Sequence, residues 1–339
     1  MIKLPFTKYP SFGRDDSEYA YACGRIKALE TRLLDRVRFE RLATAKDLGE
    51  VLKLLQDTDY SRYLNELHSP GDYEILLRRE FERVLNTVSE LALDSQLLKD
   101  LKIPYDFLNV KVVVKGLIFE KDFSSSLSKF SYYPGSVLKY VFETGKFELV
   151  DPFIAKAFEN AISSYYERKE VFRIDAAVDK VMYEYLALSS NFEFIRVFYG
   201  VKADFTNLML YLRLERLGRI NQLRVFLVDG GYLPLHLFTK VPDFQTLLNE
   251  IRQTVYHDVL ASGYQYFLRT GSFIRLERDI FTYLNELIRR GSMRDLGVEP
   301  LIAYYFRKKN ELNLLRMIMV SKINDLPKEQ ILERIPEVI

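Results

Sequence analysis

The 339-residue sequence has few of the residues that interrupt helices or build covalent and metal sites. It contains 15 glycines, 11 prolines, one cysteine, three histidines and no tryptophan. The low glycine and proline content leaves long stretches without breaks, which favours helices over the short strands of sandwiches and barrels. The single cysteine, Cys23, excludes an intramolecular disulfide and a thiolate zinc site. We expect it to be a small apolar residue on a helix.

Long apolar runs and an excess of one charge sign are also missing. The best candidate for a membrane span, residues 107–119, is short and carries Lys111 and Lys115. We therefore expect no transmembrane helix. The first residues lack the apolar region of a signal peptide. The 49 basic and 47 acidic residues nearly cancel, so the composition gives no electrostatic footprint for nucleic-acid binding.

The familiar motifs of catalysis are missing too. The histidines are far apart in the sequence, and neither a phosphate-binding loop nor a dinucleotide-binding glycine motif nor a nucleophile elbow is present. We expect no catalytic, cofactor-binding or metal site and no direct small-molecule substrate. One alternative is an α-helical enzyme with a dispersed acidic site, built for instance from Asp175, Asp179, Glu184 or Glu277.

What the sequence does contain is helical periodicity. Apolar residues recur every three or four positions from Ala22 to Val37, with charged residues between them, as on one face of an α-helix. Val110–Phe119 is rich in Val and Ile, but we interpret it as helix because Lys111 and Lys115 are at helical spacing. The predicted fold class is all-α. The same helical spacing of apolar residues recurs in residues 73–93, 153–166, 176–188, 208–217, 280–288 and 301–319.

A second signal is repetition over about 95 residues. The segments Asp106–Asn109 and Asp204–Asn207 share a D-F-x-N pattern, 98 residues apart, and each leads into an apolar helix. Glu299 opens a third such helix and Asp16 a fourth, and each acid is followed nine residues later by a base. The repetition predicts three helical units, residues 16–105, 106–203 and 204–298, with closing helices in 299–339 and an N-terminal extension in 1–15. We expect the last, partial copy to pack beside the first.

Three local features have structural interpretations. We expect Asp106, Asp204 and Glu299 to be N-terminal caps or first-turn acids of helices. The charge run Arg307–Lys309 follows aromatic residues, and we expect it to be a solvated or partner-facing helix side. Gly230-Gly231 is expected to form a tight turn between helices.

Together these features resemble one family of V/A-type rotary ATPase components, the C subunits of archaea and bacteria and the d subunits of eukaryotes. The resemblance spans about residues 16–335. It is carried by the order and spacing of the following segments: Tyr19–Glu30, Asp106–Asn109, Asp204–Asn207, Gly230–Leu233 and Glu299–Arg316.

The resemblance implies a funnel of three similar helical domains around a pseudo-threefold axis. It implies a non-catalytic rotor (central stalk) subunit on the cytoplasmic face of the membrane. Its partners would be the proteolipid ring of the membrane sector and the central shaft subunits, and it would transmit torque for ATP-coupled proton or sodium transport. The other alternative is a generic α-helical repeat scaffold that binds another protein or an RNA.

Overall fold

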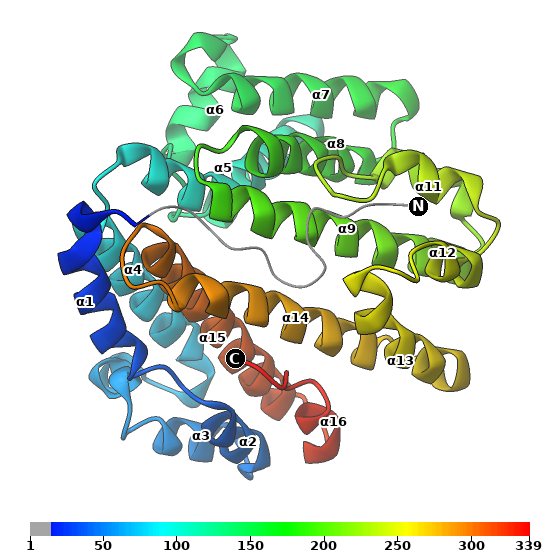
Figure 1. The fold of residues 1–339 in the computed structure, drawn as a ribbon. Helices are drawn as coiled ribbons and strands as arrows, with labels where there is room; N and C mark the ends of the chain where they lie inside the picture. The colour runs from blue at the N-terminus through cyan, green and yellow to red at the C-terminus, as the bar shows by residue number, and fades with distance from the viewer. Residues whose placement is uncertain (1–14) are drawn as a thin grey trace. The chain divides into compact units, whose positions relative to one another are not determined.

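The computed structural model describes residues 15–339, which form α-helices joined by turns and short 3-10 segments (Figure 1). No residue within 15–339 belongs to a strand, which confirms the all-α prediction. The predicted extension, residues 1–15, lies outside the described residues except for Asp15. The helices are α1 Ala20–Glu30, α2 Arg36–Thr44, α3 Leu48–Leu54, α4 Tyr73–Leu91, α5 Ser95–Ile118, α6 Gly135–Thr144, α7 Pro152–Arg168, α8 Phe172–Tyr183, α9 Glu193–Arg216, α10 Leu223–Phe226, α11 Leu235–Lys240, α12 Phe244–Glu250, α13 Val255–Thr270, α14 Ile274–Ser292, α15 Glu299–Ile323 and α16 Lys328–Leu332.

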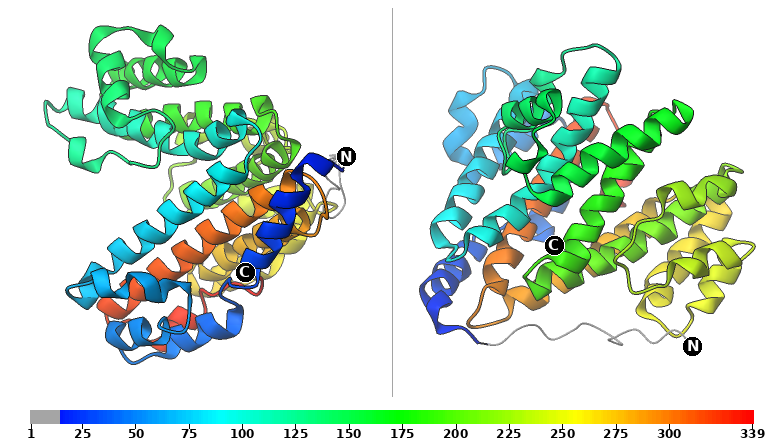
Figure 2. Two further views of the ribbon diagram at one scale, coloured as in Figure 1. Left: turned by 90° about the vertical axis from the view of Figure 1, so that its left-hand side faces the viewer. Right: turned by 90° about the horizontal axis from the view of Figure 1, so that it is seen from above.

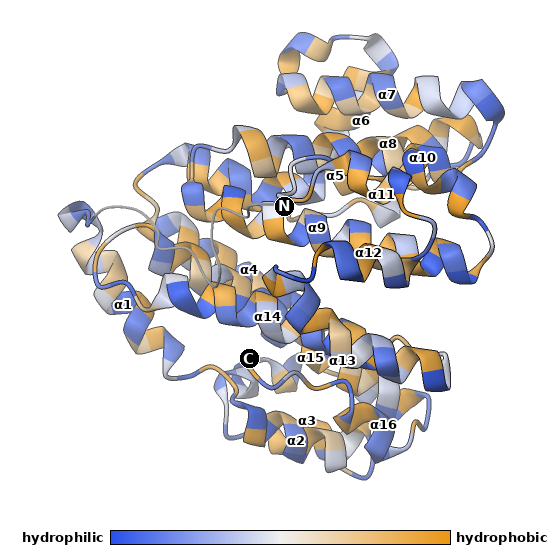
Figure 3. Ribbon diagram, turned by 45° about the vertical axis from the view of Figure 1, so that its right-hand side comes forward, coloured by the Kyte–Doolittle hydropathy of each residue, from blue (hydrophilic) through white to orange (hydrophobic). Residues whose placement is uncertain are grey.

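The described residues divide into two compact units, each with its own core. Unit 1 contains residues 94–251, and unit 2 contains residues 15–93 together with 252–339. Unit 2 therefore combines two segments of sequence that are separated by the whole of unit 1. Apolar and polar residues alternate along the helices of both units, as expected for helices that bury one face (Figure 3).

Unit 1 is organised around two long helices, α5 and α9. The antiparallel helices α7 and α8 pack against each other, and both contact α5 (Figure 1). Phe107 of α5 and Phe158 of α7 are fully buried in this region. Burying a phenylalanine side chain contributes roughly 1.5–3 kcal/mol. After α8 the chain continues as a π-helical segment, Glu184–Ser189, which packs against α9.

Unit 2 is organised around α15, which packs against α1, α4 and α14 (Figure 2). It also contacts the short helices α2 and α3. The last long helix therefore lies against helices from the first hundred residues, as we expected for the partial last copy. Ile26 of α1, Val84 of α4 and Leu315 of α15 are completely buried.

Most predicted helices are present, but one is interrupted. The periodic stretch Ala22–Val37 is divided by a break after α1, and α2 begins at Arg36. Asp35 caps α2 by accepting a hydrogen bond from Arg38 N at 2.8 Å. A side-chain cap of this kind favours a new helix start. The residues 110–119 are helical, as predicted, because nearly all of them belong to α5.

The expectation that Asp106 and Asp204 are helix caps is wrong. Both lie near the middle of long helices, α5 and α9, and both are completely buried. A proline two residues before Asp106, Pro104, is typical of a helix start, but α5 begins at Ser95 with Asp94 as its cap and continues through the proline. Glu299 does lie in the first turn of α15.

Candidate functional site

Three long helices, α5, α9 and α15, end in the same way. Each is followed by a residue with positive φ: Glu120 (52°), Gly218 (65°) and Asp325 (52°). The N–H of the next residue then bonds back to the carbonyl five positions earlier, as in a Schellman motif. These bonds join Lys121 to Gly116 at 2.8 Å, Arg219 to Leu214 at 2.8 Å and Leu326 to Ser321 at 3.0 Å.

Fourteen residues before each of these helix ends is a buried acid. Counting back from Glu120, Gly218 and Asp325 reaches Asp106, Asp204 and Glu311. None of the three acids is more than 1% exposed. The structural counterpart of Asp106 and Asp204 is therefore Glu311, and not Glu299 as the sequence pattern predicted.

In unit 1 the two aspartates hold the segments that precede α6 and α11. Asp204 accepts hydrogen bonds from Tyr232 N at 2.8 Å and Leu233 N at 3.0 Å. Asp106 accepts them from Tyr132 N at 2.9 Å and Tyr133 N at 2.8 Å. The next residues, Pro134 and Pro234, are the N-caps of α6 and α11. Each buried side chain thus fixes the extended segment before a short helix by accepting two backbone hydrogen bonds.

Glu311 makes the corresponding contact in unit 2. It accepts a hydrogen bond at 2.7 Å from the N–H of Leu34, and the next residue, Asp35, is the N-cap of α2. Each acid therefore binds the residue directly before the N-cap of a short helix. We call that residue and its preceding neighbours the strap, and we call the three contacts the acid–strap junctions. The acid of the third junction comes from α15, whereas its strap comes from the start of the described chain.

An asparagine three residues after each aspartate completes the first two junctions. The Asn207 side chain donates to Val228 O at 2.8 Å and accepts from Val228 N at 3.0 Å. Asn109 makes the same pair of bonds with Ser128, at 3.0 Å and 2.7 Å. The D-F-x-N pattern is thus explained by two buried side chains that bind one loop. The third junction has the buried Leu314 at this position.

Glu311 also belongs to a cluster of buried charges in unit 2. Lys308 is 1% exposed and contacts Glu80 at 2.7 Å and Glu311 at 2.6 Å. Arg83 binds Glu80 through two bonds, and the Tyr60 hydroxyl donates to Glu311 at 2.6 Å. The cluster joins α4 and α15 to the 3-10 segment Asp59–Glu66. Paired charges of this kind are tolerated in an interior only because each has a partner.

The charge run Arg307–Lys309 is therefore not a solvated helix side. Lys308 lies inside unit 2, and Arg307 forms an ion pair with Glu30 at 3.0 Å, with its own side chain 23% exposed. The aromatic residues before the run, Tyr304 and Tyr305, are buried as well. The sequence did not predict that these charges are buried. Because other helices cover α15 on most of its sides, its apolar residues do not form a single stripe that would mark the opposite side as exposed.

The electrostatic state of these groups follows from their surroundings. Burial raises the pKa of Asp106 to about 7, against the opposing effect of the Tyr132 and Tyr133 N–H groups. Burial alone would raise the pKa of Glu80, but Arg83 and Lys308 hold it below its usual value. Burial likewise opposes the charge on Lys308, but Glu311 and Glu80 raise its pKa.

Three of the four acids of the alternative enzyme hypothesis are paired with lysines. Lys115 pairs with Asp175, Lys111 with Asp179 and Lys156 with Glu184, all within unit 1. Glu277 is exposed on α14, in unit 2. Among residues 15–339, no three His, Cys, Asp or Glu side chains are placed to hold a metal ion.

Two further predictions concern single residues. Cys23 is buried on α1, as expected, and its thiol donates to Gly297 O at 3.2 Å. Gly230 has φ of 89° and lies in a bend between α10 and α11, where we expected a tight turn. No helix in the described part of the chain is long and apolar enough to span a membrane.

The residues of this site that sequence reasoning missed are Glu311, its partners Leu34 and Tyr60, and Glu80, which pairs with the same lysine as Glu311. The signal for Glu311 was its distance of fourteen residues from the end of a long helix, but a helix end at Asp325 is hard to recognise without a glycine.

Comparison with known proteins identifies the family. The family model described as ATP synthase (C/AC39) subunit matches residues 22–334. The chain is 26% identical to the C subunit of the A-type ATP synthase of Methanocaldococcus jannaschii, over 94% of this chain and 86% of that protein. It is 24% identical to the C subunit of the A-type ATP synthase of Methanosarcina acetivorans, over 96% of this chain and 94% of that protein. It is 25% identical to the C subunit of Haloquadratum walsbyi, over 92% of this chain and 96% of that protein. The chain therefore belongs to the ATP synthase C/AC39 family of non-catalytic subunits.

Proposed function

We propose that this chain is a rotor subunit of a V/A-type rotary ATPase and links the central shaft to the membrane proteolipid ring. In this role it transmits torque between ATP turnover and proton or sodium transport, from the cytoplasmic face of the membrane. The observation that carries the proposal is the family match over residues 22–334, almost the whole chain. The relatives with which it aligns over most of their length are named as C subunits of A-type ATP synthases.

The interior of the chain suits a part that must transmit torque without deforming. Each acid–strap junction joins the middle of a long helix to the start of a short one through hydrogen bonds to a buried acid. Such bonds are costly to break because the separated groups would stay buried and unsatisfied. The Lys308 cluster adds ion pairs between α4 and α15.

We further propose that the three junctions mark three similar helical domains, arranged as a funnel around a pseudo-threefold axis. The support is the common fourteen-residue register and the common placement of the strap before a helix cap. The boundaries 16–105, 106–203 and 204–298, with 299–339 closing the set, remain part of this proposal.

Co-purification from native membranes tests the function. The chain carries a C-terminal tag, and the membranes are dissolved in a gentle detergent. We expect the proteolipid and the ATP-hydrolysing subunits to be recovered together with it. In membranes that lack the chain, ATP hydrolysis should no longer drive ion transport. A tagged chain recovered without ATPase subunits, or ion pumping that persists without the chain, would refute the proposal.

A further inference from the structure

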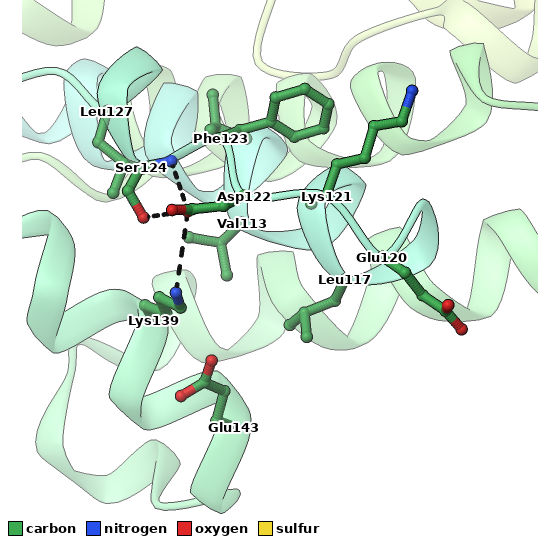
Figure 4. Close-up of a pocket in the computed structure, with 12 residues that line it drawn as sticks. Val113, Leu117, Glu120, Lys121, Asp122, Phe123, Ser124, Leu127, Lys139 and Glu143 are labelled. Atoms are coloured by element: carbon green, nitrogen blue, oxygen red, sulfur yellow. Dashed lines mark hydrogen bonds and ion pairs between the residues drawn. The ribbon is translucent and has the colours of Figure 1, made fainter.

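A hollow of about 280 Å³ lies in unit 1, where the C-terminal turn of α5 meets the following loop and α6 (Figure 4). We call it the α5–α6 hollow. Its apolar lining comes from α5 and the loop, and its volume lies just below the range of small-molecule sites. That volume suits one or two protein side chains. The apolar lining residues are Val112, Val113, Leu117, Phe123 and Leu127.

The rim of the hollow carries three acids, Glu120, Asp122 and Glu143, and two lysines, Lys121 and Lys139. The carboxylate of Asp122 has partners within the chain, because it accepts a hydrogen bond from Ser124 N at 3.0 Å and lies 4.0 Å from the Lys139 ammonium group. Glu120 and Glu143 form no ion pair with any residue between 15 and 339. In Figure 4, Leu117 lies between these two glutamates, whereas Lys121 extends in the other direction.

Glu120 adopts a backbone conformation that favours glycine. Its φ of 52° is left-handed, and α9 has Gly218 at the matching helix end. A non-glycine residue in this conformation is strained, and such strain is found at functional positions more often than elsewhere. Leu117 and Phe119, which directly precede this turn at the end of α5, are each 41% exposed. An apolar surface and a carboxylate are thus presented side by side.

From these observations we infer that the α5–α6 hollow is a docking site for another subunit of the ATP synthase complex. The docking segment presents an apolar side chain next to a lysine or arginine. The apolar side chain enters the hollow against Leu117 and Phe123, and the base pairs with Glu120 and Glu143. An anchor in a pocket with charges at the rim is the common arrangement of energetically important contacts. The inference rests on the proposed function, because it takes the partner from that complex.

A pair of matched variants tests the docking site. Glu120→Gly removes the carboxylate and the backbone strain together. Asp325→Gly does the same at the equivalent end of α15, where Asp325 is also exposed with φ of 52°. Both variants should have a melting temperature equal to or above that of the wild type. We expect Glu120→Gly alone to lower the amount of ATP synthase subunits recovered per tagged chain, by about five-fold for one lost rim pair. Glu120→Lys should lower it further.

A benzophenone amino acid in place of Leu117, introduced into the assembled complex, identifies the partner. The cross-linked peptide should come from another ATP synthase subunit and contain a lysine or arginine beside an apolar residue. Cross-linking to lipid, to a second copy of this chain or to an acidic segment would overturn the inference. Equal recovery with Glu120→Gly and Asp325→Gly would overturn it too, while leaving the proposed function intact. If even the wild-type chain recovers no ATP synthase subunits, the proposed function fails, and the inference fails with it.

Discussion

Gly231 lies directly against the carboxylate of Asp204, so that a β-carbon at this position would be 2.1 Å from Asp204 Oδ1. The same carboxylate accepts the N–H groups of Tyr232 and Leu233. The absence of a side chain at Gly231 is therefore what allows the strap to approach α9 closely enough for both bonds. The glycine pair is needed for this contact as well as for the turn.

We expect Gly231→Ala to lower the free energy of unfolding by about 2 kcal/mol or more, because the methyl group must displace the strap or the carboxylate. Gly24→Ala is the control. Gly24 lies within α1, where an added β-carbon would meet nothing within 4 Å. The control should stabilise the protein by roughly 0.5–1 kcal/mol, since alanine favours helix. Denaturant unfolding measures both, and equal effects of the two substitutions would contradict this account.

The asparagines of the first two junctions give a second prediction. Asn207→Ala removes both bonds to the backbone of Val228. The buried N–H and C=O groups of Val228 are then left without partners. We expect a loss of about 2–6 kcal/mol in unfolding free energy, from a penalty of roughly 1–3 kcal/mol for each of the two unsatisfied groups. Asn160→Ala, at an exposed position of α7, should change it by less than about 0.5 kcal/mol. A thermal or chemical unfolding series in which both variants behave alike would show that the Val228 bonds contribute little.

The buried cluster predicts a strong dependence on Lys308. Lys308→Met leaves Glu80 and Glu311 buried with less compensation, and we expect a loss of about 3–5 kcal/mol. Lys27→Met breaks the ion pair with Asp295. The side chain of Lys27 is 44% exposed and that of Asp295 is 91% exposed. Exposed pairs contribute little, so this control should cost less than about 1 kcal/mol. A Lys308→Met protein as stable as the control would mean that the cluster is hydrated.

Asp106 predicts how stability depends on pH. Its folded pKa of about 7 is above the ordinary value of 3.8, so the folded state binds more protons than the unfolded state between these values. The contribution of Asp106 to stability is thus complete below pH 3.8 and is lost as the pH rises through about 7. The loss is about 1.4 kcal/mol per pH unit within this interval.

The measurement compares unfolding free energies of the wild type and Asp106→Asn from pH 5 to pH 8. Asn does not titrate, so the difference between the two proteins isolates Asp106. The wild type should lose stability relative to the variant as the pH rises, with the change levelling off above pH 7. A difference that stays constant over this range would show that the Tyr132 and Tyr133 N–H groups outweigh burial and keep the carboxylate charged in the folded state.

The sequence predicted most helices and the aspartates of two junctions, because apolar periodicity and a repeated pattern are local signals. It misplaced those aspartates within their helices, because Pro104 predicts a helix start and the packing of α5 overrides it. It also missed Glu311. The partner of Glu311, Leu34, is 277 positions away, and no local pattern encodes a contact of that length.

The same separation has a consequence for how the protein is made. Leu34 leaves the ribosome early, yet the residue that holds it is synthesised 277 positions later. Unit 1 is continuous in sequence and has its full set of helices before α15 exists, whereas the first helices of unit 2 must wait for that helix. Contacts between distant residues form slowly, and incompletely packed helices expose apolar surface in the meantime. During synthesis the earliest part of the chain is therefore the last to reach its native state.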